Sequence, residues 1–276
     1  MNKLETMFDL TGRVAIITGG TGLLGQQHAE AIAIAGGIPV LADISVEGID
    51  PKGETFKKRF GKKASVVQAD ITDLESVKTL RAEVLKRFGR VDILINNAAN
   101  NPKMEKTVDV EFSRLENFPL SQWSADISVG LTGAFLCAQV NGSEMAKHKQ
   151  GVIVNVASDL AVIAPDQRLY RKTGLPGDQQ PVKPVTYSVV KTGLLGLTRY
   201  LATYWAETGI RVNAISPGGV HNNQPDDFIQ RLVNLIPLGR MANANEYQAA
   251  IIFLCSDASS YMTGTNLVID GGRSCW

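Results

Sequence analysis

Short runs of apolar and β-branched residues alternate along the chain with longer stretches that have helical spacing. Between two of these runs, residues 74–89 carry apolar side chains at every third or fourth position, which places them on one helical face. Near-continuous hydrophobicity in the short runs is typical of parallel strands buried on both faces. The alternation predicts an α/β fold, a doubly wound parallel sheet of about seven strands with helices on both faces. The predicted strands cover residues 13–18, 38–43, 65–70, 91–96, 152–158, 211–216 and 266–270.

The chain shows no linker, internal repeat or change of composition that would divide it. We therefore expect one domain over residues 1–276. Residues 159–186 interrupt the pattern and hold four of the 11 prolines, so we expect a substrate-loop insertion there. A second irregular segment follows the sixth predicted strand, and we expect a substrate lid over about residues 219–245. In open α/β sheets ligands bind beyond the carboxyl ends of the strands, where both segments start.

Composition narrows the class of protein. The 276 residues are 44% hydrophobic with a formal net charge of +1, which disfavours disorder and predicts no nucleic-acid or membrane partner. The basic run at residues 57–63 is expected at a helix end, where cations suit the dipole. The run 249–255 is far shorter than a membrane span, and the polar N-terminal segment does not resemble a signal peptide. We expect a cytoplasmic protein with a small-molecule substrate.

Cysteine and histidine usage predicts no metal. Cys137, Cys255 and Cys275 are odd in number and contain no Cys-x-x-Cys pair, so neither a disulfide framework nor a zinc site fits. Cys137 stands in an apolar stretch and is expected to be a buried hydrophobic residue rather than a nucleophile. The three histidines, His28, His148 and His221, lack metal-ligand spacing.

A glycine-rich turn predicts a dinucleotide site. The first strand runs directly into the turn at residues 18–25, which opens a helix whose free N–H groups suit a pyrophosphate. Asp43 ends the second strand, where a carboxylate can accept hydrogen bonds from the adenosine ribose and repel a 2′-phosphate. With no Arg or Lys in the turn or directly after Asp43, we predict NAD rather than NADP as cofactor. Gly19, Thr21 and Leu24 are the expected contacts in the turn.

Three further residues carry candidate chemistry. Tyr187 and Lys191 are four residues apart in a helical context, hence on one face. The nearby ammonium is expected to lower the pKa of Tyr187, which then serves as general acid or base. Ser158 ends the fifth predicted strand, where its hydroxyl can hydrogen-bond the reacting oxygen.

Several motifs in order resemble the short-chain dehydrogenase/reductase superfamily, in its single-domain NAD-type branch. They are TGGTGLLG, Asn96-Asn97-Ala98-Ala99, Ser158, YSVVK, RVNAISPGG and NLVIDGG, over almost the whole chain. The resemblance implies a Rossmann fold and hydride transfer between nicotinamide and substrate, while Tyr187 moves the proton. It also implies that Lys191 binds the nicotinamide ribose and tunes Tyr187. The further cofactor contacts that it implies are Asp70, Ile71, Asn97, Ala98, Ala99, Pro217, Gly218 and Val220.

The chain departs from the family pattern at three places. Leu23 stands where the single-domain branch has a glycine. Gly130 replaces the Asn that helps to hold a water in the family's proton relay, so the relay is left unassigned. Asn222 stands at the position of the usual Thr after the Pro-Gly turn and can still bond a carboxamide.

The substrate is expected to be a carbohydrate, a sugar acid or a nucleotide sugar. Arg168 and Arg171 in the insertion form a candidate pocket for an anionic group, with a solvated loop as the alternative. His221 follows the Pro-Gly turn and is a candidate substrate contact. The segments APDQRLY and GGVHNNQPDDFI are similar to short-chain enzymes of flagellin modification and nonulosonic-acid pathways.

Two other functions stay open from the sequence. One is a generic carbonyl or 3-oxoacyl thioester reductase, against which Asp43 speaks. The other is a catalytically weak NAD-binding or assembly protein, suggested by Gly130 and opposed by intact Ser158, Tyr187 and Lys191. The helices expected at 121–147 and 185–207 resemble those with which family members form dimers and tetramers, so a homodimer or homotetramer is expected.

Overall fold

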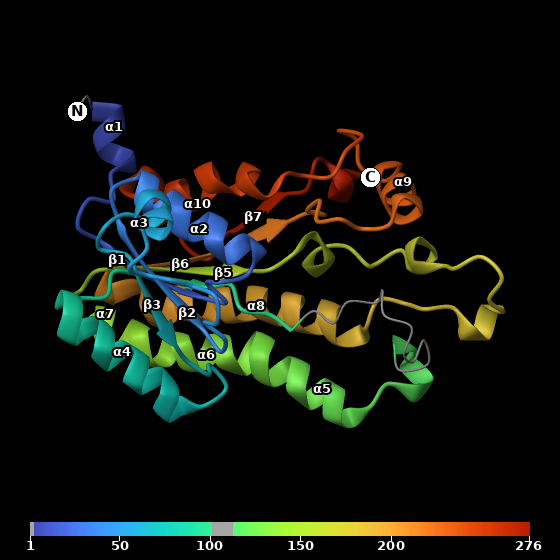
Figure 1. Cartoon of the computed structure of the whole chain (residues 1–276), viewed down its shortest axis with the longest axis horizontal. Coiled ribbons are helices and arrows are strands. Elements are labelled where there is room, and N and C mark those ends of the chain that lie inside the picture. Colours follow the sequence, from blue (N-terminus) through green and yellow to red (C-terminus); the bar gives the residue numbers. More distant parts are fainter. Residues whose placement is uncertain (1–2, 101–112) are drawn as a thin grey trace.

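A single sheet of seven parallel strands forms the centre of the computed structural model, which describes residues 3–100 and 113–276 (Figure 1). The strand order is β3-β2-β1-β4-β5-β6-β7. The strands are β1 Val14–Thr18, β2 Ile38–Asp43, β3 Ser65–Gln68, β4 Ile93–Asn96, β5 Gly151–Val156, β6 Ile210–Pro217 and β7 Asn266–Ile269. Every predicted strand is present, and the predicted doubly wound α/β fold is confirmed.

Helices cover both faces of this sheet (Figure 1). Helices α2, α3 and α10 lie on one face, and α4 to α8 lie on the other. The helices are α1 Lys3–Phe8, α2 Leu23–Ile34, α3 Glu54–Phe60, α4 Leu74–Phe88, α5 Leu120–Ile127, α6 Gly133–Cys137, α7 Ser143–Lys147, α8 Val185–Tyr204, α9 Asp226–Val233 and α10 Gln248–Cys255. Strand order reverses between β1 and β4, which makes the carboxyl ends of these strands the place where a ligand crevice is expected.

Alternation within the strands divides the interior into two cores. In β1, Val14 and Ile16 belong to the core under α4, α6 and α8, whereas Ala15 and Ile17 belong to the core under α2 and α10. Successive side chains of a strand point to opposite faces, so a strand covered on both sides must be apolar at every position. Cys137 is fully buried in the first core, and burial raises the pKa of its thiol to about 12. A thiol so placed is not a nucleophile.

The expected helix at 121–147 is interrupted twice. Two π-helical segments, Ser128–Thr132 and Ala138–Gly142, separate α5, α6 and α7. Each begins and ends in right-handed helical backbone, so the segments continue one another along the face of the sheet (Figure 1). Such π-helical turns occur frequently at functional sites, and the first of them contains Gly130.

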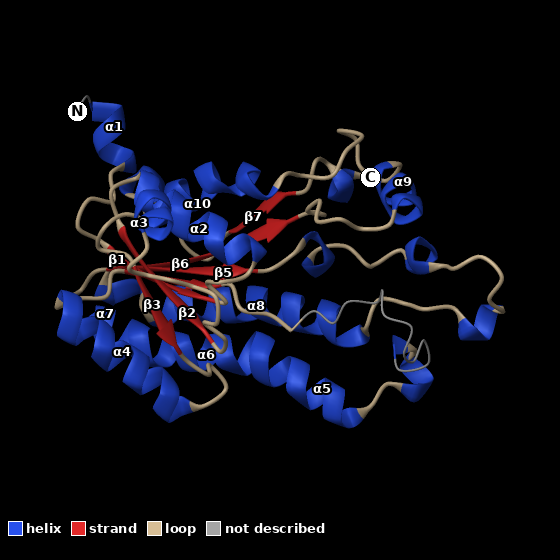
Figure 2. Cartoon of the chain, in the orientation of Figure 1, coloured by secondary structure: helices blue, strands red, loops and turns tan. Residues whose placement is uncertain are grey.

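Long connections gather at the carboxyl edge of the sheet. The chain after β5 runs through three short 3₁₀ turns before α8 begins, and the chain after β6 carries α9 (Figure 2). In the 159–186 segment these turns cover Asp159–Ala161, Gln167–Tyr170 and Gly177–Gln179. The irregular character predicted for this segment is therefore observed, and it lies at the edge where a ligand crevice is expected.

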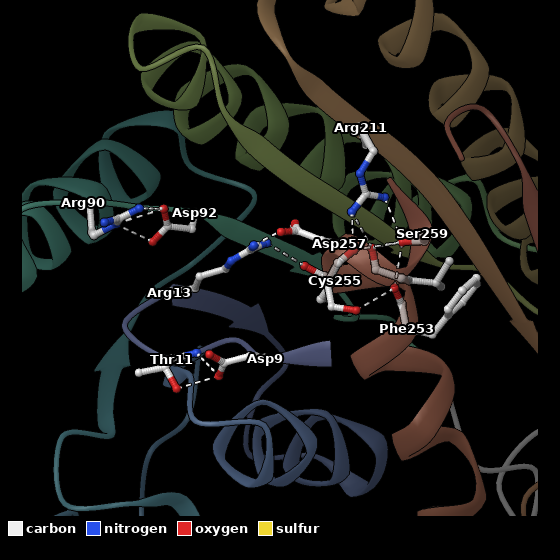
Figure 3. A network of polar contacts seen from close by, with 12 residues as sticks. Asp9, Thr11, Arg13, Arg90, Asp92, Arg211, Phe253, Cys255, Asp257 and Ser259 are labelled. Atoms are coloured by element: carbon white, nitrogen blue, oxygen red, sulfur yellow. Dashed lines mark hydrogen bonds and ion pairs between the residues drawn. The ribbon is translucent and has the colours of Figure 1, made fainter. Parts of the chain in front are cut away.

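Polar contacts close the opposite edge, where β1, β4 and β6 begin (Figure 3). The Asp92 carboxylate accepts a hydrogen bond from the Val14 backbone N–H at 2.8 Å and so joins β4 to β1. Arg13 pairs with Asp257 at 2.7 Å, and Arg211 donates to backbone carbonyls at the end of α10. These contacts anchor the strands at the edge away from the glycine-rich turn.

Within residues 3–100 and 113–276, none of the helices combines the length and the apolar character of a membrane span. The same residues contain no group of three or more His, Cys, Asp or Glu side chains placed to hold a metal ion.

One buried histidine predicts acid sensitivity of the fold. His28 on α2 is fully buried, and burial lowers its pKa from 6.5 to about 4. Both of its ring nitrogens lack a hydrogen-bond partner among the described residues. As pH falls through this range the unfolded chain gains a proton that the folded chain does not, so the free energy of unfolding falls. The shift corresponds to roughly 3 kcal/mol in all.

Denaturant unfolding of the wild type and His28→Leu at several pH values between 7 and 4 measures this effect. We expect the wild type to lose more stability than His28→Leu on acidification. His221→Gln, which changes an exposed histidine, should behave like the wild type. Equal acid losses in the wild type and His28→Leu would show that another group controls the sensitivity.

Candidate active site

A cavity of about 680 Å³ opens at the carboxyl edge of the sheet. It is lined by the turn after β1, by the ends of β2, β4, β5 and β6, and by the start of α8. Ser158, Tyr187 and Lys191 line it together with every cofactor contact expected from the sequence. Those contacts are Gly19, Thr21, Leu24, Asp43, Asp70, Ile71, Asn97, Ala98, Ala99, Pro217, Gly218 and Val220.

Two glycines of the glycine-rich turn, Gly19 and Gly25, leave no room for a side chain. Gly19 adopts φ +61°, and a Cβ at this position would lie 2.8 Å from Ala98 Cα. A Cβ at Gly25 would lie 2.1 Å from the Gly19 carbonyl oxygen. No side chain caps the N-terminus of α2 at Gly22, so the first N–H groups of the helix are left for a ligand. A bare turn beside free N–H groups fits the pyrophosphate of a dinucleotide. Leu23, the departure from the family pattern, opens α2 and is 43% exposed, so this position does not require glycine.

Asp43 contacts this turn from the end of β2. Its Oδ2 accepts hydrogen bonds from Thr21 Oγ1 at 2.6 Å and from the Thr21 backbone N–H at 3.1 Å. The carboxylate therefore belongs to the same wall as the turn, with Oδ1 bonded at 3.4 Å to the Ser45 N–H. Asp70 and Ile71 follow β3 in the same wall, as a site for adenine would require.

Asn97 joins the end of β4 to the glycine-rich turn. Its Nδ2 donates to the carbonyl oxygens of Thr18 and Gly19 at 3.0 and 3.1 Å. Thr18 Oγ1 accepts the backbone N–H groups of Asn97 and Ala98 in return. The motif at residues 96–99 therefore has a structural role, because it holds the floor of the cavity against the glycine-rich turn.

Ser158, Tyr187 and Lys191 meet at one end of the cavity. Ser158 lies two residues after the end of β5, and Tyr187 and Lys191 lie on the first turns of α8. Lys191 Nζ donates to the Val156 carbonyl oxygen at 2.8 Å and lies 5.9 Å from the centre of the Tyr187 ring. All three side chains line the same cavity, so an alcohol bound there can exchange a proton with the phenol.

The pKa of Tyr187 differs from the sequence expectation. Burial raises it, a hydrogen bond with Ser158 lowers it, and the charge of Asp159 raises it. Lys191 is itself buried, and burial together with the charge of Lys183 lowers its pKa to about 8. The expectation that the ammonium lowers the pKa of Tyr187 is thus corrected, because burial has the largest effect on this pKa and raises it.

At Gly130, the position of the family's relay Asn, the packing of α8 leaves no room for a side chain. A Cβ at Gly130 would lie 2.4 Å from Val190 Cγ1, on the facing turn of α8. A small recess beside it is lined by Asn100, Asp126 and Lys183 as well as by Tyr187 and Lys191. Asp126 accepts a hydrogen bond from Asn100 Nδ2 at 2.8 Å. Polar groups from neighbouring elements therefore line the region beside Gly130, where the sequence left the relay unassigned.

The candidate substrate residues of the insertion are placed differently. Arg168 forms two-point hydrogen bonds with Asp166 in its own loop, and its side chain is 74% exposed. Arg171 and His221 are also exposed. None of these three residues lines the cavity. The alternative of a solvated loop therefore describes the two arginines.

Two further cations, Lys183 and Arg273, line the cavity in addition to Lys191, and sequence reasoning missed both. Burial lowers the pKa of Lys183 to about 8, and the charge of Asp159 opposes this. Lys183 Nζ lies 3.7 Å from the centre of the Tyr187 ring. Its position four residues before Tyr187 was the available signal. Arg273 directly follows the NLVIDGG motif.

Apolar side chains from the insertion and from α9 form the outer wall. Leu169, Leu232 and Met241 belong to one cluster with Tyr170 and Phe228 packed against it. Asn222, the substituted Thr position, also lines the cavity. The substrate end thus combines a polar floor with an apolar wall, the usual composition of a small-molecule site.

Comparison with known proteins places this geometry in a family. Residues 13–170 match the family model described as short chain dehydrogenase, and residues 178–274 match the one described as Enoyl-(Acyl carrier protein) reductase. D-threitol dehydrogenase of Mycolicibacterium smegmatis is 33% identical over 96% of this chain and 94% of its own length. NAD-dependent glycerol dehydrogenase of Listeria innocua is also 33% identical, over 96% of this chain and 95% of its own length.

A solved structure is similar to this chain in both sequence and fold. The NADPH-dependent 3-quinuclidinone reductase of Rhodotorula rubra is 31% identical with a TM-score of 0.84, over 100% of this chain and 96% of that one. The seven-stranded sheet and the matches across both halves of the sequence lead to one assignment. The chain belongs to the short-chain dehydrogenase/reductase family, oxidoreductases that act on CH–OH groups with a nicotinamide cofactor.

Proposed function

We propose that this protein interconverts a secondary alcohol and a ketone on a carbohydrate-type substrate, with NAD as cofactor. The substrate classes are polyols, sugar acids and nucleotide sugars. The observation that carries the proposal is that Ser158, Tyr187 and Lys191 line the same cavity as the glycine-rich turn and Asp43.

Each residue has a role in this proposal. The cofactor, when bound, accepts or donates the hydride. Tyr187 takes the proton of the alcohol or returns it to the ketone, and Ser158 hydrogen-bonds the reacting oxygen. Lys191, held by the Val156 carbonyl, binds the nicotinamide ribose and stabilises the phenolate. The turn with Gly19, Thr21 and Leu24 holds the pyrophosphate, Asp43 the ribose, and Pro217, Gly218 and Val220 cover the nicotinamide.

A carbohydrate-type substrate is supported by two observations. Two relatives that match nearly the whole chain are named for threitol and glycerol. The cavity floor beside Tyr187 carries Ser158, Asp159, Lys183 and Arg273, which can bond several hydroxyl groups or a carboxylate at once.

A second candidate is the reduction of a 3-oxoacyl thioester. The apolar wall formed by Leu169, Phe228, Leu232 and Met241 favours it, as does the description of the family model over residues 178–274. An acyl chain would lie against that wall, whereas a polyol would leave it unused.

A substrate panel separates the two. The purified protein is given NAD or NADP with D-threitol, glycerol, mannitol, gluconate and a 3-hydroxyacyl thioester, and reduced nicotinamide is followed by absorbance. We expect the highest kcat/KM with NAD and a polyol or sugar acid. Preference for the thioester would replace the first candidate by the second, and no turnover of any substrate in the panel would contradict both.

We also propose that residues 1–276 form one dinucleotide-binding domain, with residues 159–186 as a substrate insertion and 219–245 as a lid. Exposed aromatic side chains on α6 and α8 suit contact with a second copy of the chain. Phe135, Tyr200 and Tyr204 are 44%, 63% and 65% exposed. A homodimer or homotetramer would cover them, and light scattering on the purified protein measures its mass.

A further inference from the structure

A buried arginine lines the cavity close to the candidate catalytic serine. Arg273 Nη1 donates to Asp159 Oδ2 at 2.7 Å, and Asp159 Oδ1 accepts the Ser158 hydroxyl at 2.8 Å. The arginine and the serine therefore bond the two oxygens of one carboxyl group, and all three residues line the cavity. A substrate held at Ser158 can thus reach the guanidinium with a group that lies a few bonds from its reacting carbon.

The turn after β7 is shaped to deliver this arginine. Gly271 and Gly272 follow β7 with φ of +68° and +88°, values that favour glycine. The Asp270 carboxylate accepts the N–H groups of Gly272 and Ser274 at 2.9 and 2.8 Å and fixes the turn. Arg273 is thereby held at the carboxyl edge of the sheet, with its side chain only 7% exposed.

The guanidinium of Arg273 keeps one edge for a ligand. A guanidinium has five N–H donors, and Asp159 accepts from Nη1. Among the described residues, Nε and Nη2 of Arg273 have no hydrogen-bond partner. Charged donors that are nine-tenths buried cost free energy unless an acceptor is present, so this edge is suited to a bound group that accepts hydrogen bonds.

Arg168 shows in the same protein what this edge of a guanidinium binds. Its Nε and Nη2 donate to the two carboxylate oxygens of Asp166 at 2.9 and 2.7 Å. The two nitrogens point in parallel, and a carboxylate presents two oxygens in one plane with matching spacing. The corresponding edge of Arg273 is therefore suited to a carboxylate.

Tyr170 adds a neutral donor beside the arginine. It lines the cavity, and its ring packs against Phe228 with ring centres 5.6 Å apart. Burial raises the pKa of Tyr170 and the charge of Arg273 lowers it; the effect of burial is the larger, so the phenol keeps its proton at neutral pH. Its hydroxyl has no hydrogen-bond partner among the described residues, so it can donate to an oxygen of the same ligand.

The charge of the cavity wall also favours an anion near Ser158. The charged residues that line this end, within the part of the chain that the structure describes, are Lys183, Lys191, Arg273 and Asp159. The other two acids of the lining, Asp43 and Asp70, belong to the wall of the glycine-rich turn. An anionic group at the substrate end is attracted by the three cations, whereas a neutral polyol gains nothing from their charge.

We propose that Arg273, assisted by Tyr170, binds the carboxylate of a hydroxy-acid substrate, which makes sugar acids the substrate class rather than neutral polyols. The proposal rests on the proposed function, since Ser158 and Tyr187 fix where the reacting carbon lies. Arg273 thus takes the role that the sequence suggested for the arginines of the insertion.

The first test compares sugar acids with the polyols of the same configuration in NAD-dependent oxidation. The pairs are D-gluconate with D-sorbitol, D-mannonate with D-mannitol and D-galactonate with galactitol, and each differs only in a carboxylate in place of a terminal CH₂OH. We expect the best acid to exceed its polyol in kcat/KM by roughly 10- to 100-fold, the range for hydrogen bonds to a charged group. D-sorbitol 6-phosphate is included, and a preference for it would overturn the assignment to a carboxylate.

Variants then show whether Arg273 and Tyr170 make this distinction. Arg273→Gln should remove most of the preference for the acid, and Tyr170→Phe should reduce it about two- to tenfold, the value of one hydrogen bond. The ratio of the two kcat/KM values is the readout, because damage to the fold or to Ser158 lowers both substrates alike. Arg171→Gln removes the same charge at an exposed position outside the cavity and should keep the wild-type ratio.

The outcomes separate this proposal from the proposed function. A wild type that prefers the polyols, or an unchanged ratio in both Arg273→Gln and Tyr170→Phe, would overturn the carboxylate site and leave the proposed function standing. If Arg273→Gln does not fold, Tyr170→Phe and the wild-type comparison still decide. If neither acids nor polyols are oxidised at all, the proposed function itself has failed.

Discussion

Tyr187→Phe should abolish most of the alcohol oxidation while leaving the fold and cofactor binding intact. The change removes only the phenolic oxygen, and the ring stays packed at the start of α8 under Lys183. General acid–base catalysis contributes about 10²–10⁴-fold in rate, so kcat should fall by that factor. Formation of reduced nicotinamide measures kcat, and fluorescence titration with NADH measures whether the cofactor still binds.

Tyr200→Phe is the matched control for this variant. Tyr200 lies on the same helix, is 63% exposed and stacks on Tyr204 away from the cavity. Its hydroxyl has no place in the proposed chemistry, so this variant should keep the wild-type rate. A rate in Tyr187→Phe equal to that of the wild type would contradict the mechanism, and equally low rates in both would favour the NAD-binding or assembly protein instead.

The pH profile adds a second readout for Tyr187. Alcohol oxidation requires the phenolate, and burial raises the pKa of Tyr187. The oxidation rate of the wild type should therefore increase as pH rises above neutrality, and ketone reduction should decrease. The residual oxidation by Tyr187→Phe should lack this increase, since the variant has no group to deprotonate at that position.

The parts of the site that follow local rules could be predicted from the sequence. Tyr187 and Lys191 share a face because they are four residues apart in a helix, and Ser158 reaches the cavity because it lies two residues after the end of a strand. The same holds for the five inner strands, β1, β2, β4, β5 and β6, since most of their residues are buried and each strand therefore reads as a short apolar run.

Long-range contacts account for what the sequence did not predict. Asp159 and Arg273 are 114 residues apart, and no periodicity connects them. The charges of Arg168 and Arg171 indicated an anion pocket, but Arg168 finds a closer partner in Asp166 of its own turn. The pKa of Tyr187 depends on how much water the folded chain excludes, which residue spacing does not measure.

The reason for Gly130 could not be predicted from the sequence either, because it depends on packing between helices. Its lack of a side chain looked like the loss of a relay residue, whereas the structure gives a steric reason in Val190 on the facing helix. Asp126, which lines the recess there, lies on α5, and Lys183, which also lines it, lies two residues before α8 begins. The sequence shows only that position 130 has no side chain, whereas the fold shows which residues line the recess beside it.

Asp43→Asn should weaken discrimination against NADP by about two to three orders of magnitude. The carboxylate ends β2 and contacts Thr21 in the glycine-rich turn, so a 2′-phosphate on the adenosine ribose would lie beside a negative charge. Two like unit charges at about 4 Å cost about 4 kcal/mol near a protein surface. The asparagine removes that repulsion and keeps the size of the side chain. The ratio of kcat/KM for NAD to that for NADP, taken with one alcohol, measures the change.

Ile44→Arg added to Asp43→Asn should go further and reverse the preference. Ile44 follows Asp43 directly, is 63% exposed and lines the cavity, so an arginine can reach a 2′-phosphate from this position without disturbing a core. Glu47→Gln removes an exposed acid a few residues away and controls for the general change of charge. If Asp43→Asn shifts the ratio no more than Glu47→Gln does, then Asp43 does not read the ribose, and the choice of cofactor must come from the shape of the wall around it.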